Sequence, residues 1–201
     1  MTDVDPRLVA AMREQLSRRP DSAERVGWKY GSGLDEQIGG DHVVGHLTSA
    51  TVLADGDTYR GGGAKLQADV EVAVEVGDDL TSSRYGVALE ICDVALDGTI
   101  EDVVIDNDFH RAVAFGRFAD ALPDGCEGSL AVNGERRAGG LASEDLVERL
   151  GGVDRVLRAV GEQLRPGDRV ITGLIVNTRV ASGDEVEATL DSVGSVALRI
   201  A

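Results

Sequence analysis

The sequence predicts one α+β domain whose sheet is mixed or antiparallel. Strand patterns dominate the chain, and the longest of them lies at 65–94, where apolar and polar residues alternate in two neighbouring segments. Helical patterns are few and do not alternate regularly with strands, which argues against a βαβ repeat. The 201 residues are enough for one domain with a full hydrophobic core. We therefore expect residues 1–24 to form an N-terminal helix and connector, and residues 25–201 to form a single domain.

The N-terminal part predicts a helix followed by strands. Asp5 and Pro6 are a favoured pair for starting a helix, and the basic run before Pro20 ends it. Residues 25–31 form a short strand in which Trp28 is a core anchor and Lys29 points to the opposite face. A glycine-rich loop with one possible helical turn follows at 31–41.

Two histidines, His42 and His46, lie four residues apart in a segment at 42–53 whose β-branched residues favour a strand. On a helix this spacing would indicate a metal pair. On a strand the two side chains share a face but lie farther apart. A ligand role for either one is therefore the alternative interpretation.

The central segment predicts a hairpin with carboxylates on one face. In its first strand, aliphatic residues at every second position alternate with Asp69, Glu71 and Glu75. In its second strand, Glu90 is the single charge within an apolar run. A carboxylate in such surroundings is costly unless it is paired or binds a metal. Asp69, Glu71 and Glu90 together favour a hard divalent cation. The simpler alternative is a solvated outer face, which we expect for Glu75.

The second half continues the α+β pattern. Residues 99–105 predict a short strand or loop, and Asp106, Asn107 and Asp108 then cap a helix at 109–122. Asn133-Gly134 indicates a tight hairpin turn. Ser143 caps a helix at 144–164 that two glycines interrupt. Strands at 169–176, 185–190 and 195–200 complete the fold.

The composition excludes several classes of protein. The net charge of −16 and the absence of a basic patch argue against nucleic-acid binding. No apolar run is long enough to span a bilayer, and the N-terminal segment does not look like a signal peptide. Cys92 and Cys126 have no metal or redox spacing, so we expect buried free thiols in the reducing cytoplasm.

The order of eight short segments resembles the fumarylacetoacetate hydrolase superfamily, in its branch of 2-hydroxypenta-2,4-dienoate (2-keto-4-pentenoate) hydratases and 4-oxalocrotonate decarboxylases. The segments are GWKYG (27–31), QADVEVAVEVGDDL (67–80), VALEICD (87–93), DN (106–107), LAVNGE (130–135), LRPGDRVITG (164–173), SGDEVEA (182–188) and VGSVALRI (193–200). The resemblance covers roughly residues 25–201. It implies a roll or barrel-like mixed sheet with flanking helices and a homo-oligomer, a dimer or larger.

The resemblance also implies a site. Asp69, Glu71 and Glu90 would hold Mg²⁺ or Mn²⁺, with Asp69 standing where the family has a glutamate. Lys29 would be the catalytic lysine that contacts the substrate carboxylate or enolate. Asp106 and Arg111 are the further candidates for substrate binding, and His110 is a weaker one.

Two departures from the family pattern concern substrate contacts. Val43 and Val44 stand where the branch has an acidic residue before the glycine that aligns with Gly45. Phe109 and His110 follow the Asp-Asn-Asp run where the branch often has a serine. Two polar contacts to substrate are therefore absent, and the substrate need not be the simplest dienoate.

The function implied by the resemblance is metal-dependent hydration of a 2-hydroxy-2,4-dienoate, an α-keto or enol acid, in the catabolism of aromatic or related compounds. A 4-oxalocrotonate-type decarboxylase is one alternative. An acylpyruvate-type hydrolase is another, although the sequence has no histidine before His42 for the usual His–Glu pair. The alternative outside enzymes is an inactive scaffold subunit of the same fold.

Overall fold

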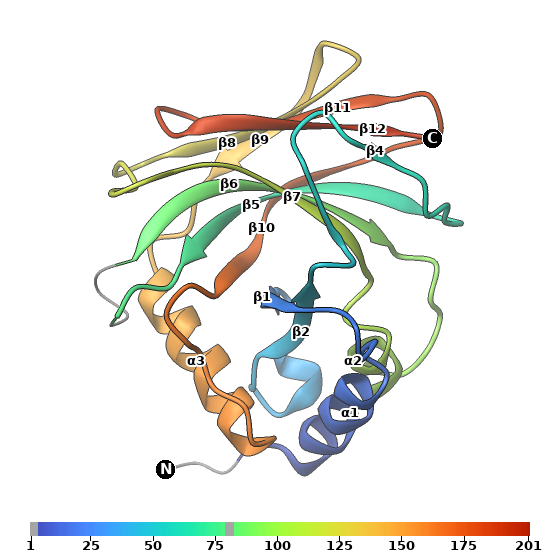
Figure 1. Ribbon diagram of the computed structural model, residues 1–201, viewed down its shortest axis with the longest axis vertical. Coiled ribbons are helices and arrows are strands. Elements are labelled where there is room, and N and C mark those ends of the chain that lie inside the picture. Colours follow the sequence, from blue (N-terminus) through green and yellow to red (C-terminus); the bar gives the residue numbers. More distant parts are fainter. Residues whose placement is uncertain (1–3, 79–82) are drawn as a thin grey trace.

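The structure, a computed structural model, describes residues 4–78 and 83–201. Two β-sheets stack on one another in the upper half of the molecule, and helices surround strands β1 and β2 in the lower half (Figure 1). This arrangement confirms the predicted α+β class. Residues 1–3 and residues 79–82, which fall between the two strands of the predicted central hairpin, lie outside the described residues.

Among the described residues, the larger sheet has seven strands in the order β2-β1-β10-β5-β6-β7-β3. Their bounds are β1 Arg25–Gly31, β2 Val43–Thr48, β3 Val52–Leu53, β5 Leu66–Glu75, β6 Arg84–Asp93, β7 His110–Ala119 and β10 Arg169–Arg179. The pairs β1–β10 and β3–β7 are parallel and the others antiparallel, so the sheet is mixed, as predicted. It curls from the upper layer down to β1 and β2 (Figure 1).

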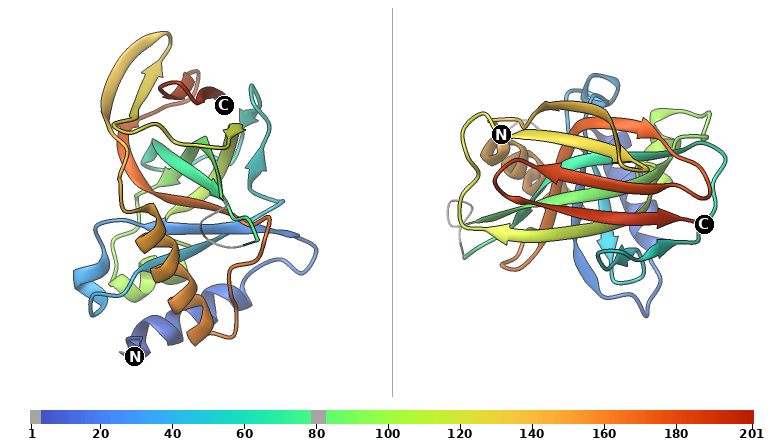
Figure 2. Two further views of the ribbon diagram at one scale, coloured as in Figure 1. Left: turned by 90° about the vertical axis from the view of Figure 1, so that its left-hand side faces the viewer. Right: turned by 90° about the horizontal axis from the view of Figure 1, so that it is seen from above.

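The second sheet lies over one face of the larger sheet (Figure 2). Its strands, in the order β4-β12-β11-β8-β9, are β4 Thr58–Tyr59, β12 Gly194–Ile200, β11 Glu185–Leu190, β8 Glu127–Val132 and β9 Glu135–Leu141. The Asn133-Gly134 turn joins β8 to β9 with both residues at positive φ, which confirms that hairpin.

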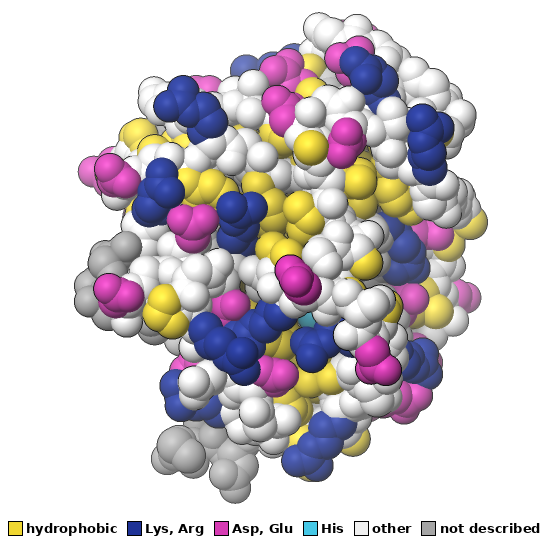
Figure 3. Space-filling view, viewed as in Figure 1, with side chains coloured by type: hydrophobic (Ala, Val, Ile, Leu, Met, Phe, Trp, Pro, Cys, Tyr) yellow, Lys and Arg dark blue, Asp and Glu magenta, His cyan; other side chains and the backbone are white. Residues whose placement is uncertain are grey.

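The two faces of β5 have different surroundings, as the alternation predicts. The even-numbered residues Val70, Val72 and Val74 belong to the core between the sheets, together with Leu130 and Leu198. The odd-numbered residues face the other way, into the curl of the larger sheet. Hydrophobic side chains are also visible over the strands of the larger sheet on the face seen in Figure 3.

The helices are α1 Pro6–Ser17, α2 Ile100–Ile105 and α3 Leu146–Ala159, with a 3₁₀ turn at Asp35–Ile38. Asp5 caps α1 by accepting a 2.8 Å hydrogen bond from the Arg7 amide, as predicted. Helix α3 contains two consecutive glycines. A side chain at Gly152 would overlap the ring of His42, so this glycine permits the close approach of α3 to that ring. No helix among the described residues is long and apolar enough to cross a membrane.

Two element predictions are wrong. Residues 109–122 do not form a helix, because β7 pairs with β6 and buries the run from Ala112 to Ala114 on both faces. Residues 100–105 are helical, where a short strand or loop was predicted, since Thr99 and Asp102 form a capping box that starts α2. The predicted helix at 144–164 is shorter than expected, and β2 and β3 divide the expected strand at 42–53.

Candidate metal centre

The three predicted metal ligands lie on adjacent strands inside the curl of the larger sheet. Asp69 on β5 is directly opposite Glu90 on β6, and Glu71 is two residues along β5 on the same face. Asp69 is 9 % exposed, Glu71 2 % and Glu90 0 %. These acids are therefore not a solvated outer face. Glu75 behaves differently, since it is half-buried and pairs with Arg84 and Arg169.

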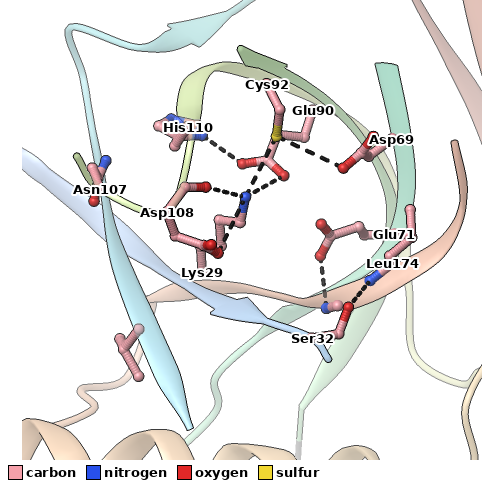
Figure 4. Close-up of polar contacts among 12 residues, drawn as sticks. Lys29, Ser32, Asp69, Glu71, Glu90, Cys92, Asn107, Asp108, His110 and Leu174 are labelled. Carbon is pink, nitrogen blue, oxygen red and sulfur yellow. Dashed lines mark hydrogen bonds and ion pairs between the residues drawn. The ribbon is translucent and has the colours of Figure 1, made fainter. Parts of the chain in front are cut away.

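Lys29 enters the same space from β1 and neutralises part of this charge (Figure 4). Its Nζ lies 2.9 Å from Glu90 Oε2 and 3.4 Å from Asp108 Oδ2, and it donates a 2.8 Å hydrogen bond to the Asp108 carbonyl. Trp28 lies fully buried in the core, so the predicted opposite orientation of the two neighbours is confirmed.

Asp108 belongs to the site because it contacts Lys29. The sequence pattern had assigned this residue only to a helix cap. It reaches Lys29 because Asn107, Asp108 and Phe109 all have positive φ, at 63°, 52° and 62°. This conformation costs about 1–2 kcal/mol per residue outside glycine. Two hydrogen bonds between the Asn107 side chain and the His46 backbone, at 2.7 and 3.0 Å, hold the turn against that cost.

His110 contacts Glu90 on the side away from the cavity. Its Nδ1 lies 2.7 Å from Glu90 Oε1, and its Nε2 lies 3.0 Å from the Thr51 hydroxyl. Burial lowers the pKa of His110 and so favours the neutral ring. A neutral ring that donates from Nδ1 to Glu90 accepts the Thr51 proton at Nε2. His110 thus positions Glu90 and does not line the cavity.

The four buried carboxylates have divergent pKa values. Burial, followed by the charge of Glu90, raises the pKa of Asp69 to about 7 and that of Glu71 well above its usual value. Burial raises the pKa of Asp108 to about 6. Burial also opposes ionisation of Glu90, but Lys29 and the hydrogen bond from His110 outweigh it and hold the pKa at about 2. The cluster thus has more acids than Lys29 can neutralise.

The donor set fits a divalent cation. Asp69 Oδ1 is buried without a hydrogen-bond partner, which is costly unless another ligand satisfies it. Glu71 Oε2 accepts a 2.7 Å hydrogen bond from the Gly173 amide, so its second oxygen is available. Within the described part of the chain, the tight group of candidate ligand atoms consists of Asp69, Glu90 and Cys92. Cys92 is a donor that the sequence analysis treated as a buried thiol.

A cavity of about 180 Å³ is lined by Lys29, Asp69, Glu71, Cys92 and Asp108, but not by Glu90. Apolar residues complete its wall, among them Leu34, Val94, Phe109 and Leu174, and Gln67 and Asn177 add amides. Gln67 is opposite Cys92, and Asn177 is opposite Asp69, in the strand register. Phe109 therefore lines the site where the resemblance expects a serine. A larger hollow of about 680 Å³ near the start of α3 lacks this buried charge cluster.

Several predicted site residues lie elsewhere. Arg111 and Asp106 form a 2.8 Å ion pair with each other, and neither lines the cavity. His42 packs on Tyr30 with ring centroids 4.5 Å apart, whereas Nδ1 of His46 lies 3.3 Å from the Gln15 side chain. The structure therefore does not bring these four residues to the carboxylates, and a substrate role for Arg111 and Asp106 stays a prediction.

Comparison with known proteins identifies the fold. No protein-family model and no curated protein matches the sequence. The structure is similar to 4-oxalocrotonate decarboxylase from Pseudomonas putida G7 in complex with magnesium and adipate, with a TM-score of 0.83 and 19% identity over 96% of this chain and 86% of that chain. Fumarylpyruvate hydrolase from Pseudomonas aeruginosa, in complex with Mn²⁺ and pyruvate, gives a TM-score of 0.62, with 17% identity over 91% of this chain and 93% of that chain.

A protein from Yersinia pestis CO92 assigned to the fumarylacetoacetate hydrolase family gives a TM-score of 0.66, with 21% identity over 90% of this chain and 94% of that chain. The protein therefore has the fold of the fumarylacetoacetate hydrolase superfamily. This result confirms the fold that the eight sequence segments implied.

Proposed function

We propose that this protein is a divalent-metal-dependent enzyme that acts on a 2-oxo acid or its enol. One observation carries the proposal: Asp69, Glu71 and Glu90 meet on one buried face, beside a single ammonium group and next to a cavity. A structural role alone does not account for this cluster, because apolar residues of similar size would avoid the desolvation of four carboxylates.

The ion that these carboxylates would hold is Mg²⁺ or Mn²⁺, since both prefer oxygen ligands. Solved structures with the same fold contain magnesium, calcium or manganese. When bound, such an ion supplies a Lewis acid that stabilises negative charge on a substrate oxygen.

The chain's own residues supply the rest of the chemistry. Lys29 is fixed by Glu90 and Asp108, so its charge is aimed at the cavity without reorganisation. Such preorganised positive charge favours the enolate oxygen or the carboxylate of the substrate. Phe109 and Leu174 provide apolar contacts for the carbon chain and exclude water from it.

Within this class, we propose hydration of a 2-hydroxy-2,4-dienoate. The enol would gain a proton at C5, and water would then add at C4, so that the product is a 4-hydroxy-2-oxo acid. The experiment is a spectrophotometric assay of 2-hydroxypenta-2,4-dienoate with Mn²⁺ or Mg²⁺. We expect turnover that EDTA abolishes and that falls by at least about 100-fold in Asp69→Asn and Glu71→Gln, as for loss of a group that stabilises the transition state.

Glu75→Gln is the matched control because it changes a carboxylate on the same strand outside the cavity. Its ion pairs with Arg84 and Arg169 are partly exposed, and we expect activity within about twofold of the wild type. Equal losses in Glu75→Gln and Glu71→Gln would contradict a specific site. If the folded protein binds the metal ion but does not turn over dienoates, the hydratase assignment is wrong.

Decarboxylation of a 2-oxo diacid of the 4-oxalocrotonate type is the second candidate. The decarboxylase structures match at TM-scores of 0.83 and 0.84, whereas the hydrolase matches at 0.62. Release of CO₂ from such a diacid, with no consumption of the dienoate, would favour this candidate. Release of pyruvate from an acylpyruvate would instead favour a hydrolase.

A further inference from the structure

Cys92 lies in the metal centre, in contact with Asp69 and Lys29, and the proposed function assigns it no role. It follows Glu90 by two residues on β6, so both side chains point into the curl of the sheet. Its Sγ lies 3.7 Å from Asp69 Oδ2 and 3.5 Å from Lys29 Nζ (Figure 4). The residue lines the cavity and is 3 % exposed.

The distances suit a shared ion. Each of the three residues Asp69, Glu90 and Cys92 offers one ligand atom, and these atoms all lie within 4.8 Å of one another. Ligand atoms bound at about 2.0–2.3 Å from one ion lie no more than about 4.6 Å apart. The three side chains are therefore near enough to share one ion if they close around it.

A second observation points independently to a ligand in this space. Asp69 Oδ1 is buried and has no hydrogen-bond partner, and the whole residue is only 9 % exposed, so water does not satisfy this oxygen from bulk solvent. Its other oxygen faces the Cys92 thiol. An unsatisfied carboxylate oxygen next to a thiol, both on the cavity wall, forms an incomplete ligand shell.

We propose that Cys92 is a sulfur ligand of this centre when a borderline-soft divalent ion such as Co²⁺ or Zn²⁺ occupies it, so that the centre binds these ions more tightly than its carboxylates alone would. Thiolate ligands favour these ions, whereas a set of oxygen ligands alone favours Mg²⁺ and Mn²⁺. The thiol proton passes to solvent when sulfur binds the ion. This inference rests on the proposed function, because it adds a ligand to the same metal site.

The test is a titration of metal-stripped protein with Co²⁺, followed by absorption spectroscopy. A sulfur ligand produces an intense charge-transfer band in the near ultraviolet, which oxygen ligands do not produce. We expect this band in the wild type and in Cys126→Ser, which changes the other cysteine, a residue of the loop before β8 whose Sγ lies 3.4 Å from the Asp191 carbonyl.

We expect Cys92→Ser and Cys92→Val to lack the band while they still bind Co²⁺ through carboxylates. Zn²⁺ affinity should fall by at least about tenfold in both variants, and Mg²⁺ affinity should change by less than about twofold. Two variants are used because serine introduces a buried hydroxyl, whereas valine fills the space with apolar atoms. Far-ultraviolet circular dichroism establishes that each variant is folded.

Each other outcome is decisive. Wild-type protein that binds Co²⁺ without a charge-transfer band overturns the role of Cys92 and leaves the proposed carboxylate centre intact. A band that persists in folded Cys92→Ser also overturns it. Wild-type protein that binds none of the three ions overturns both this inference and the proposed function.

Discussion

Replacement of Lys29 by methionine tests the electrostatic balance of the site. Lys29 is 5 % exposed and contacts two carboxylates, at 2.9 Å from Glu90 and 3.4 Å from Asp108. Without it, the metal-free cluster retains its buried acids and loses its ammonium group. The variant therefore removes one partner of a buried ion pair while it keeps a side chain of similar length.

Removal of one partner from a buried pair costs about 3–5 kcal/mol, because the other charge is left uncompensated. For a chain of this size, each kcal/mol lowers the melting temperature by about 2–4 °C. We therefore expect Lys29→Met to melt about 6–20 °C below the wild type in EDTA at pH 8. At pH 5 the loss should be smaller, since the remaining carboxylates can bind protons instead.

Differential scanning calorimetry measures this difference directly. Lys65→Met is the matched control, because Lys65 is the other lysine of the chain and is exposed. We expect it to melt within about 2 °C of the wild type, as surface substitutions usually do. If Lys29→Met melts as high as Lys65→Met at both pH values, Lys29 does not neutralise the cluster and the electrostatic account is wrong.

Two further predictions concern protons and packing. In metal-stripped protein we expect stability to fall as the pH rises from about 4 to 7, because the pKa values of Asp69, about 7, and Asp108, about 6, make the native state bind more protons than the unfolded chain in that window. Thermal melts across this range should show a flatter profile for Asp69→Asn, and equal slopes would refute the assignment. In urea unfolding, Gly151→Ala should stabilise α3 by up to about 1 kcal/mol, since nothing lies within 4 Å of its added methyl group. Gly152→Ala should destabilise it by about 1–3 kcal/mol through overlap with His42, and a gain there would contradict the packing described for α3.

Local sequence patterns are sufficient for β5, β6 and the strands after residue 126, and for three carboxylates of the site. The period of two on β5 places Asp69 and Glu71 on one face, and the apolar run around Glu90 indicates its burial. Both features depend only on neighbours along the chain. The same spacing rule also puts Cys92 on the face of Glu90, so its position was available from the sequence.

Asp108 and His110 depend on contacts that no local pattern records. The turn that directs Asp108 to Lys29 needs three consecutive residues at positive φ, and it is held by hydrogen bonds between the Asn107 side chain and the backbone of His46 on β2, which is distant in the sequence. His110 reaches Glu90 only because β7 replaces the helix that the local pattern favoured. Pairing with β6 outweighs the local helical preference in this segment.

The cluster of Asp69, Glu71 and Glu90 as a divalent metal centre is the central claim, and calorimetric titration of metal-stripped protein tests it most directly. Mg²⁺ and Mn²⁺ would be titrated with and without oxalate, which resembles the chelating end of a 2-oxo acid enolate. We predict saturable binding that oxalate strengthens and that Glu71→Gln weakens by at least about tenfold, as expected for loss of a ligand. An absence of binding in the wild type, with or without oxalate, would contradict the claim.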